Sequence, residues 1–318
     1  MGLYTRVVDD LLALFETTSF RTGLRLGIIA LAIGWALRFA TGRYRPPMPI
    51  GGVLVAAATM LAFYRTEEPL GNALPALGLI LLGVLIARIT KAPTWVPPLA
   101  AIPGAVWLAF GSPISEFTWV RVLIAVLIPV AGYLISDFET RYDRMGLGVV
   151  FFTLAALGAF AAVPDTEQAL VLIATALPIT LLAWPKVAVS LGMEGSFLAV
   201  ALLLWVTAAG GGGRPPSIVG SAACLGFLLL EPILVRLRPA LADVRFRLRQ
   251  NWLGAVLASI PQFVLVIICS RIAARFSIML PALLVIAAGY AIAIGLGLYV
   301  GSRQPERVDT PVFPEAPT

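Results

Sequence analysis

The chain alternates between long apolar runs and short polar connections along almost its whole length. A membrane-spanning helix needs about 20 mostly apolar residues, and eleven runs approach or reach that length. They cover residues 22–41, 48–64, 71–89, 93–110, 118–136, 145–163, 167–184, 187–208, 217–235, 252–270 and 278–300. The pattern predicts an all-α, polytopic membrane bundle of about eleven transmembrane helices, with no soluble domain between them.

Two of these runs deviate from a regular membrane-spanning helix. The run 48–64 is short, and the run 93–110 contains Pro97, Pro98 and Pro103. A proline inside a helix removes a backbone hydrogen bond. Either run could therefore be re-entrant or broken, which would give nine to eleven spans.

The two ends of the chain differ from the single transmembrane domain expected over residues 21–300. Residues 1–20 carry apolar side chains at helical spacing, among them Leu3 and Val7. This spacing predicts an interfacial amphipathic helix that lies on the membrane surface. Residues 301–318 combine prolines with alternating charges, which predicts a disordered cytoplasmic tail.

The composition supports membrane residence and excludes several kinds of chemistry. Hydrophobic residues make up 59% of the chain and charged residues only 13%, about half of the ~25% typical of soluble domains. The chain has no histidine and 2 cysteines, which excludes histidine-dependent triads and histidine-ligated zinc or haem. We therefore expect no cofactor, and any proton chemistry has to use carboxylates.

The basic residues predict an orientation. If the connection after residue 41 is cytoplasmic, the inner side collects more than twice as many Lys and Arg residues as the outer side. This positive-inside bias places the N-terminus outside and the C-terminus in the cytoplasm. Because the net charge of +6 is spread over these connections, it indicates contact with the lipid bilayer, and no nucleic-acid partner is expected.

Glu194 is the charged residue that this reading places deepest inside an apolar run. It follows the start of the run 187–208 by seven residues, or about 10 Å at 1.5 Å per residue. A carboxylate at the centre of a span costs about 2.5–3.5 kcal/mol. With Ser190 and Ser196 beside it, Glu194 could bind a cation, a proton or a substrate amine in a polar cavity. Alternatively, the helix starts later and Glu194 is interfacial, or it forms a static bond to a neighbouring helix.

Two further groups are candidates for a substrate path or a lipid contact. Glu231 precedes Pro232 near the inner end of its run, where it could line a path or pair locally. The segment that follows reads as a basic amphipathic helix, which is either a topology determinant or a docking surface for anionic lipid or a lipid-linked phosphate. Its expected lipid contacts are Arg236, Arg238, Arg245, Arg247 and Arg249.

An acidic segment follows the run 118–136. Asp137, Glu139 and Asp143 could together hold Mg²⁺ for a phosphate substrate. The spaced aspartate pairs of lipid-phosphate transferases are absent, however. We interpret the segment as a solvated helix end in which Asp137 pairs with Arg141, and we expect no metal site.

One part of the chain resembles a known group of proteins. From Asp137-Phe138 through Gly146-Leu147-Gly148 and residues 163–167 to Trp184-Pro185, it resembles uncharacterised multi-pass membrane proteins of actinobacteria. The resemblance covers about residues 137–185. It implies a bacterial plasma membrane, and it implies no activity and no functional residue.

Two classes of function fit these observations. The first is a transporter or flippase-like carrier of a small or lipid-linked substrate, with Glu194 as its central polar group. The second is a non-catalytic membrane subunit that scaffolds a cell-envelope complex and binds a membrane-protein partner. A membrane-embedded transferase ranks third, because the sequence shows no acid–base or metal constellation.

Overall fold

The computed structural model describes residues 16–41, 48–65, 72–112, 116–141, 147–162, 167–182, 189–209, 215–237 and 252–302. Within these ranges the chain forms eleven α-helices. The other regular contact in them is an isolated parallel β-bridge between Met48 and Val189. The all-α prediction is therefore confirmed.

Each apolar run of the sequence corresponds to one helix, with ends that differ by a few residues. The helices are α2 (Thr18–Thr41), α3 (Gly51–Arg65), α4 (Ala73–Ile89), α5 (Val96–Gly111), α6 (Thr118–Arg141), α7 (Leu147–Ala162), α8 (Glu167–Leu182), α9 (Met193–Ala209), α10 (Pro215–Leu237), α12 (Trp252–Ala274) and α13 (Met279–Ser302). The predicted segment 1–20 lies largely outside the described residues, as does the tail beyond Ser302.

The prolines do not break the run 93–110. Pro97 follows Val96, the first residue of α5, and Pro103 lies inside the same continuous helix. Proline is tolerated in the first turn, where the backbone N–H has no intrahelical partner. α3 is also continuous, but it begins only at Gly51, so the start of the run 48–64 is not helical.

The helices differ in length. Three of those in the described chain are long and apolar enough to cross a membrane by length and composition, at Thr18–Thr41, Thr118–Thr140 and Met279–Leu296. Seven other described helices are apolar but only 10–17 residues long by the same measure. The three long helices support membrane association.

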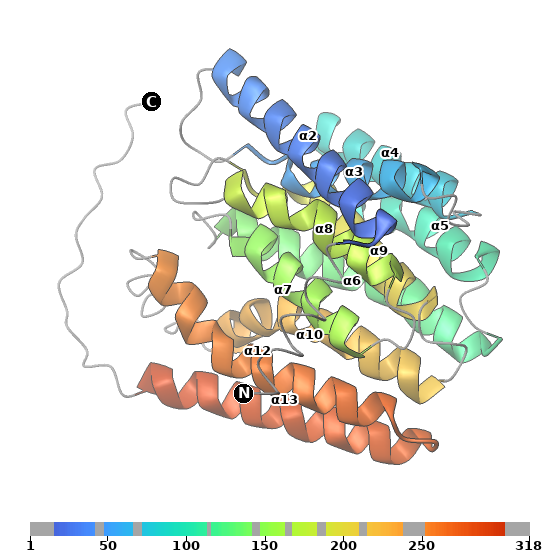
Figure 1. Ribbon diagram of the computed structural model, residues 1–318, viewed down its shortest axis with the longest axis vertical. Helices are drawn as coiled ribbons and strands as arrows, with labels where there is room; N and C mark the ends of the chain where they lie inside the picture. Colours follow the sequence, from blue (N-terminus) through green and yellow to red (C-terminus); the bar gives the residue numbers. More distant parts are fainter. Residues whose placement is uncertain are drawn as a thin grey trace.

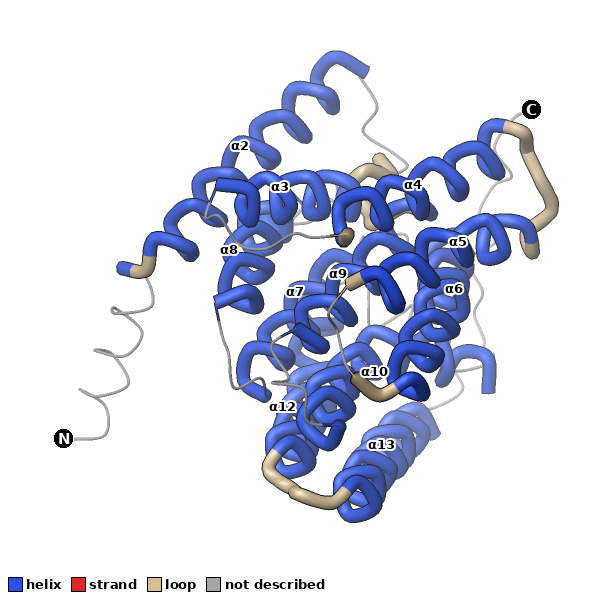
Figure 2. Tube along the Cα trace, turned by 90° about the vertical axis from the view of Figure 1, so that its right-hand side faces the viewer, coloured by secondary structure: helices blue, strands red, loops and turns tan. Residues whose placement is uncertain are grey.

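The helices lie side by side in one bundle, from α2 at one edge to α12 and α13 at the other (Figures 1 and 2). α9 occupies the interior, where it contacts α3, α4, α6 and α10. Every side chain from Glu194 to Ala208 is buried. A helix that is apolar on all faces is expected in such a position, so α9 forms the centre around which the bundle is built.

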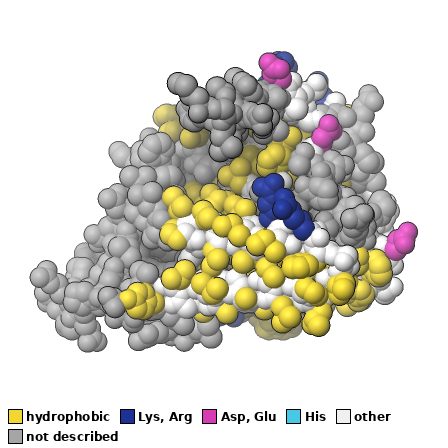
Figure 3. Space-filling view, turned by 60° about the horizontal axis from the view of Figure 1, so that its bottom comes forward, with side chains coloured by type: hydrophobic (Ala, Val, Ile, Leu, Met, Phe, Trp, Pro, Cys, Tyr) yellow, Lys and Arg dark blue, Asp and Glu magenta, His cyan; other side chains and the backbone are white. Residues whose placement is uncertain are grey.

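The outer surface is rich in large apolar side chains. Trp107 on α5 and Ile89 on α4 are exposed, as are Leu280 and Leu284 on α13. Figure 3 shows a broad hydrophobic face interrupted by a group of basic side chains. Soluble monomers rarely expose contiguous apolar patches larger than a few hundred Å², so this surface favours contact with lipid.

Candidate functional site

The structure corrects the predicted depth of Glu194. α9 begins at Met193, and residues 189–192 are not helical. Glu194 is therefore the second residue of the helix, and it does not lie seven residues inside a span. Its side chain is nevertheless buried, with 3% of the residue surface exposed. The later helix start expected as an alternative is therefore observed. Its second part, an interfacial Glu194, is not, because the side chain is buried.

Glu194 forms an ion pair with Arg88, which lies in the last turn of α4. The Nη1 atom of Arg88 donates to both Oε1 and Oε2 of Glu194 at 3.0 Å. The two side chains differ in exposure, with 47% for Arg88 and 4% for Glu194. The guanidinium group thus covers a buried carboxylate. Because Glu194 lies in the first turn of α9, the positive end of the helix dipole also stabilises its negative charge.

A second buried carboxylate, that of Glu139 near the end of α6, binds the backbone just before α9. Its Oε1 accepts a hydrogen bond from the N–H of Leu191 at 3.0 Å, and its Oε2 accepts one from Gly192 at 2.9 Å. Gly192 has a φ of +76°, a conformation that glycine adopts without steric cost. Glu139 therefore caps the start of a helix that belongs to another part of the chain.

The segment before α9 runs alongside the segment before α3, in parallel, where the two helices begin. The N–H of Ser190 donates to the carbonyl of Met48 at 3.0 Å, and the N–H of Gly51 donates to the carbonyl of Ser190 at 2.8 Å. The N–H of Gly52 donates to the carbonyl of Leu191 at 3.2 Å. We call residues 48–52 and 189–195 together the entry crossing. Each non-helical segment satisfies backbone groups of the other, as buried irregular backbone requires.

Glycine allows this crossing to be tight. A Cβ atom built on Gly195 would lie 2.7 Å from the Cα atom of Gly52, closer than real Cβ atoms approach other heavy atoms. The backbones of α3 and α9 are therefore in direct contact at their first turns. The glycines and serines around Glu194 therefore lie where two helices begin against each other.

The predicted residues around Glu194 lie in the entry crossing or directly next to it. Ser190 contributes its backbone groups, and the buried hydroxyl of Ser196 donates to the carbonyl of Gly192 at 2.8 Å. Glu231 belongs to α10, and its side chain lies outside the part that the structure describes.

The predicted lipid-binding arginines are described in part. The Nη2 atom of Arg236, near the end of α10, donates to Oδ2 of Asp137 at 2.9 Å, and its guanidinium carbon lies 5.7 Å from the centroid of the Tyr133 ring. Its side chain is 47% exposed, so one face is open to other ligands. The remaining residues lie outside the described ranges, namely Arg238, Arg245, Arg247 and Arg249.

The interpretation of the acidic segment as a solvated helix end is wrong for Glu139. α6 continues to Arg141, as a helical reading of the segment requires. Glu139, however, is only 8% exposed, because it lies one and two turns from Ile135 and Gly132 on the face of α6 that packs against α9.

The role of Arg88 was also not identified from the sequence. The signal for Glu139 was available, since its spacing from Ile128 and Ile135 places it on the apolar face of α6. No comparable signal marks Arg88, because its side chain reaches a partner 106 residues away.

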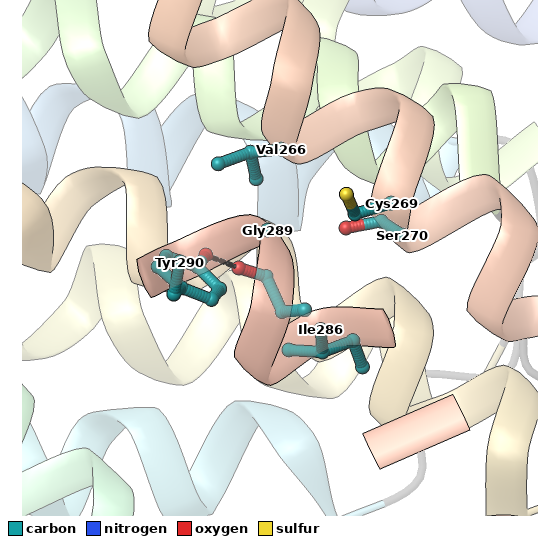
Figure 4. A pocket seen from close by; sticks show the side chains of 7 residues that line it. Val266, Cys269, Ser270, Ile286, Gly289 and Tyr290 are labelled. Atoms are coloured by element: carbon teal, nitrogen blue, oxygen red, sulfur yellow. Dashed lines mark hydrogen bonds between the residues drawn. The ribbon is translucent and has the colours of Figure 1, made fainter. Parts of the chain in front are cut away.

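A small hollow lies elsewhere, between α10, α12 and α13 (Figure 4). It is lined by Cys269, Ser270 and Tyr290, among others, and it has no room for a water molecule. The Tyr290 hydroxyl donates to the carbonyl of Ala223. The lining includes none of the charged residues of the entry crossing, so this hollow does not lead to Glu194. Among the described residues, no group of three His, Cys, Asp or Glu side chains is placed to hold a metal ion.

Comparison of the chain with protein-family models, with curated proteins and with solved structures gives no match.

Proposed function

We propose that the protein is a membrane carrier for a small or lipid-linked substrate and that substrate passage is controlled at the entry crossing. The observation that carries this proposal is the meeting of two non-helical segments beside two buried carboxylates, Glu139 and Glu194. Carriers commonly place unwound backbone and helix ends at their substrate sites. Ionisable residues inside a membrane protein commonly mark ion or substrate paths.

The proposal includes a topology. All eleven helices cross a bacterial plasma membrane, with the N-terminus outside and the C-terminus in the cytoplasm. Contacts between helix ends support this arrangement, because Arg88 at the end of α4 and Glu139 at the end of α6 both bind the start of α9. The charge pattern assigns these three helix ends to the same side. Helices shorter than a span are accommodated by burial in the bundle and by local thinning of the bilayer.

The carrier is tested in reconstituted vesicles with two probes. Pyranine-loaded vesicles report proton movement, and fluorescent NBD-phosphatidylglycerol with dithionite reports lipid movement between leaflets. We expect the protein to accelerate at least one probe over protein-free vesicles. We expect Glu194→Gln, which removes the charge and keeps the shape, to slow that probe by about tenfold or more.

Glu116→Gln is the matched control, because Glu116 is exposed between α5 and α6. It should leave the rate unchanged. A Glu194→Gln variant as fast as the unmodified protein contradicts a role of Glu194 in transport, and an unmodified protein that moves neither probe contradicts a carrier of either type.

The second candidate function is that of a non-catalytic subunit or scaffold of a cell-envelope complex. The observation that favours it is that Glu139 and Glu194 both bond to groups of the same chain, as carboxylates with a structural role do. This function predicts that neither probe moves and that a stoichiometric membrane-protein partner copurifies in digitonin. A monodisperse single chain in digitonin contradicts it.

A further inference from the structure

The start of α9 is fixed from outside the helix by Glu139. Gly192 directly precedes Met193, where α9 begins, and its carbonyl accepts a helical hydrogen bond from the N–H of Ser196 at 2.9 Å. The carboxylate of Glu139 binds the N–H of Gly192 at 2.9 Å and the N–H of Leu191 at 3.0 Å. Gly192 is thus held at its donor by α6 and at its acceptor by α9, so the conformation of the first turn of α9 depends on Glu139.

Glu194 lies in the turn that this contact fixes. It follows Gly192 by two residues, and both of its carboxylate oxygens accept from Arg88 of α4 at 3.0 Å. Hydrogen bonds weaken steeply when their distance and angle depart from the preferred values. A shift of the first turn of α9 would therefore move the carboxylate away from the guanidinium group. The Arg88–Glu194 ion pair requires the turn at Gly192 to keep its conformation.

α7 closes the space around the carboxylate of Glu139. Gly148 lies in the first turn of α7, and a Cβ atom built on it would overlap Oε1 of Glu139. The same Cβ atom would lie 3.1 Å from Cδ1 of Leu191. Glycine permits such a close approach of the backbone because it has no side chain. A methyl group at position 148 would therefore displace the carboxylate of Glu139 without removing its charge.

The two buried carboxylates differ in the kind of partner that they bind. Both oxygens of Glu139 accept from backbone N–H groups, and losing these bonds would leave buried donors without partners, which is costly. The partner of Glu194 is a side chain that is 47% exposed, so water can solvate the guanidinium group of Arg88 when the ion pair opens. Glu194 can therefore change partners at a lower cost than Glu139 can.

We propose that Glu139 is a positioning residue, which holds Glu194 against Arg88 by fixing the turn at Gly192, and that Glu194 is the carboxylate that meets the substrate. This inference rests on the proposed function and gives the two carboxylates different roles in it. Glu139 acts on transport through Glu194 and does not contact the substrate itself.

The positioning role is tested first without a transport assay. Arg88→Ala is made alone and combined with Glu139→Gln or with Gly148→Ala, and unfolding in mixed micelles is followed by titration with SDS. Alone, Arg88→Ala should lower the SDS midpoint, because it leaves a buried carboxylate without its partner. In either combination, Arg88→Ala should lower the midpoint by less than about half as much, because Glu194 no longer lies against Arg88. If Glu139 only adds stability of its own, the full shift remains.

Asp137→Asn is the matched control background. Asp137 is another carboxylate of α6, two residues earlier, and it binds Arg236 of α10. In this background Arg88→Ala should produce its full shift. An equally reduced shift there would indicate general loosening and overturns the proposal, as does a full shift in both Glu139→Gln and Gly148→Ala. Loss of the folded size-exclusion peak in both of these variants also overturns it, because Glu139 would then be needed for the whole fold.

The vesicle assay supplies a second readout. Glu139→Gln and Gly148→Ala should each slow the active probe by about tenfold or more, as Glu194→Gln does. Combining Glu139→Gln with Glu194→Gln should slow it no further, because residues that act as a unit are not additive. A further tenfold loss in the combined variant would show that Glu139 acts in transport by itself, and it overturns the proposal.

The SDS titration needs no transported substrate. A protein that moves neither vesicle probe contradicts the carrier, whereas full SDS shifts in both backgrounds contradict the positioning role alone. The two proposals can therefore fail separately.

Discussion

The two buried carboxylates show how an apolar bundle accommodates negative charge. Glu139 accepts two backbone N–H bonds, and Glu194 accepts two contacts from one guanidinium nitrogen. Hydrogen bonds to a charged group are worth about 1.5–3 kcal/mol each. Both side chains therefore contribute to stability in addition to any part they have in transport.

Replacing Glu139 with Gln is expected to destabilise the protein. The amide keeps one acceptor oxygen but presents an NH₂ group to a backbone N–H, so either Leu191 or Gly192 loses its partner. A buried donor without a partner costs about 1–3 kcal/mol. The free energy of unfolding in mixed detergent micelles, measured by titration with SDS, should fall by about this amount.

Asp137→Asn is the control for that substitution, because Asp137 lies two residues earlier in α6 and its partner Arg236 is 47% exposed. Exposed ion pairs contribute about 0–1 kcal/mol. If the free energy of unfolding falls equally in the two variants, the cap that Glu139 places on α9 contributes no more than an exposed ion pair.

At the residue scale, the sequence identified Glu194 but misjudged the reason for its burial. An apolar run gives no sign of where the helix begins within it, because Val187, Ala188 and Val189 are as apolar as helical residues. The partners of Glu194 and of the α9 backbone come from α4 and α6, and a single sequence without relatives contains no information that connects them.

Among the elements, the contact between α3 and α9 depends on the absence of side chains at Gly52 and Gly195. Gly52→Ala should force the two helices apart, because a Cβ atom there would lie 2.6 Å from the carbonyl oxygen of Gly195. Overpacking of this kind typically costs 1–3 kcal/mol. We expect a lower midpoint of thermal unfolding in detergent. The monodisperse peak in size-exclusion chromatography should be lost after heating to a lower temperature than for the unmodified protein.

Gly78→Ala is the matched control within another short apolar helix. The added methyl group meets nothing within 4 Å, and alanine is a better helix former than glycine by about 1 kcal/mol. The thermal midpoint should stay the same or rise slightly. A fall comparable to that of Gly52→Ala would show that both effects are generic for glycine in this fold.

At the element scale, the sequence predicted where the helices lie but not which helices pack against each other. Apolar length predicted every helix that the structure describes, since a buried or lipid-facing helix must be apolar over most of its length. The packing of α2 against α8 was not predictable in the same way. Gly27 lies against Thr175 and Pro178 there, and nothing in the spacing of small residues names the helix that approaches them.

At the scale of the whole molecule, most charged side chains of the described helices lie near helix ends, and many large apolar ones lie on the outer surface. This distribution leads to a test of the topology with single cysteines in the Cys224→Ala, Cys269→Ala background. We expect Gly212→Cys to react with an impermeant maleimide added outside the cell. Lys91→Cys should react only after the membrane is opened, because the positive-inside bias places its connection in the cytoplasm.

The two positions control for each other, since both lie in short connections between helices and differ only in the predicted side. Reaction of both from outside, or a reversal of the two, would contradict the proposed orientation and the count of eleven crossings.

The central position of α9 has a consequence for biogenesis. During synthesis, residues 48–52, Arg88 and Glu139 all emerge before the segment that binds them, which begins at Val189. Until that segment enters the bundle, three earlier parts of the chain hold polar groups that lack their final partners. A chain interrupted after α8 therefore presents several unsatisfied polar sites at once.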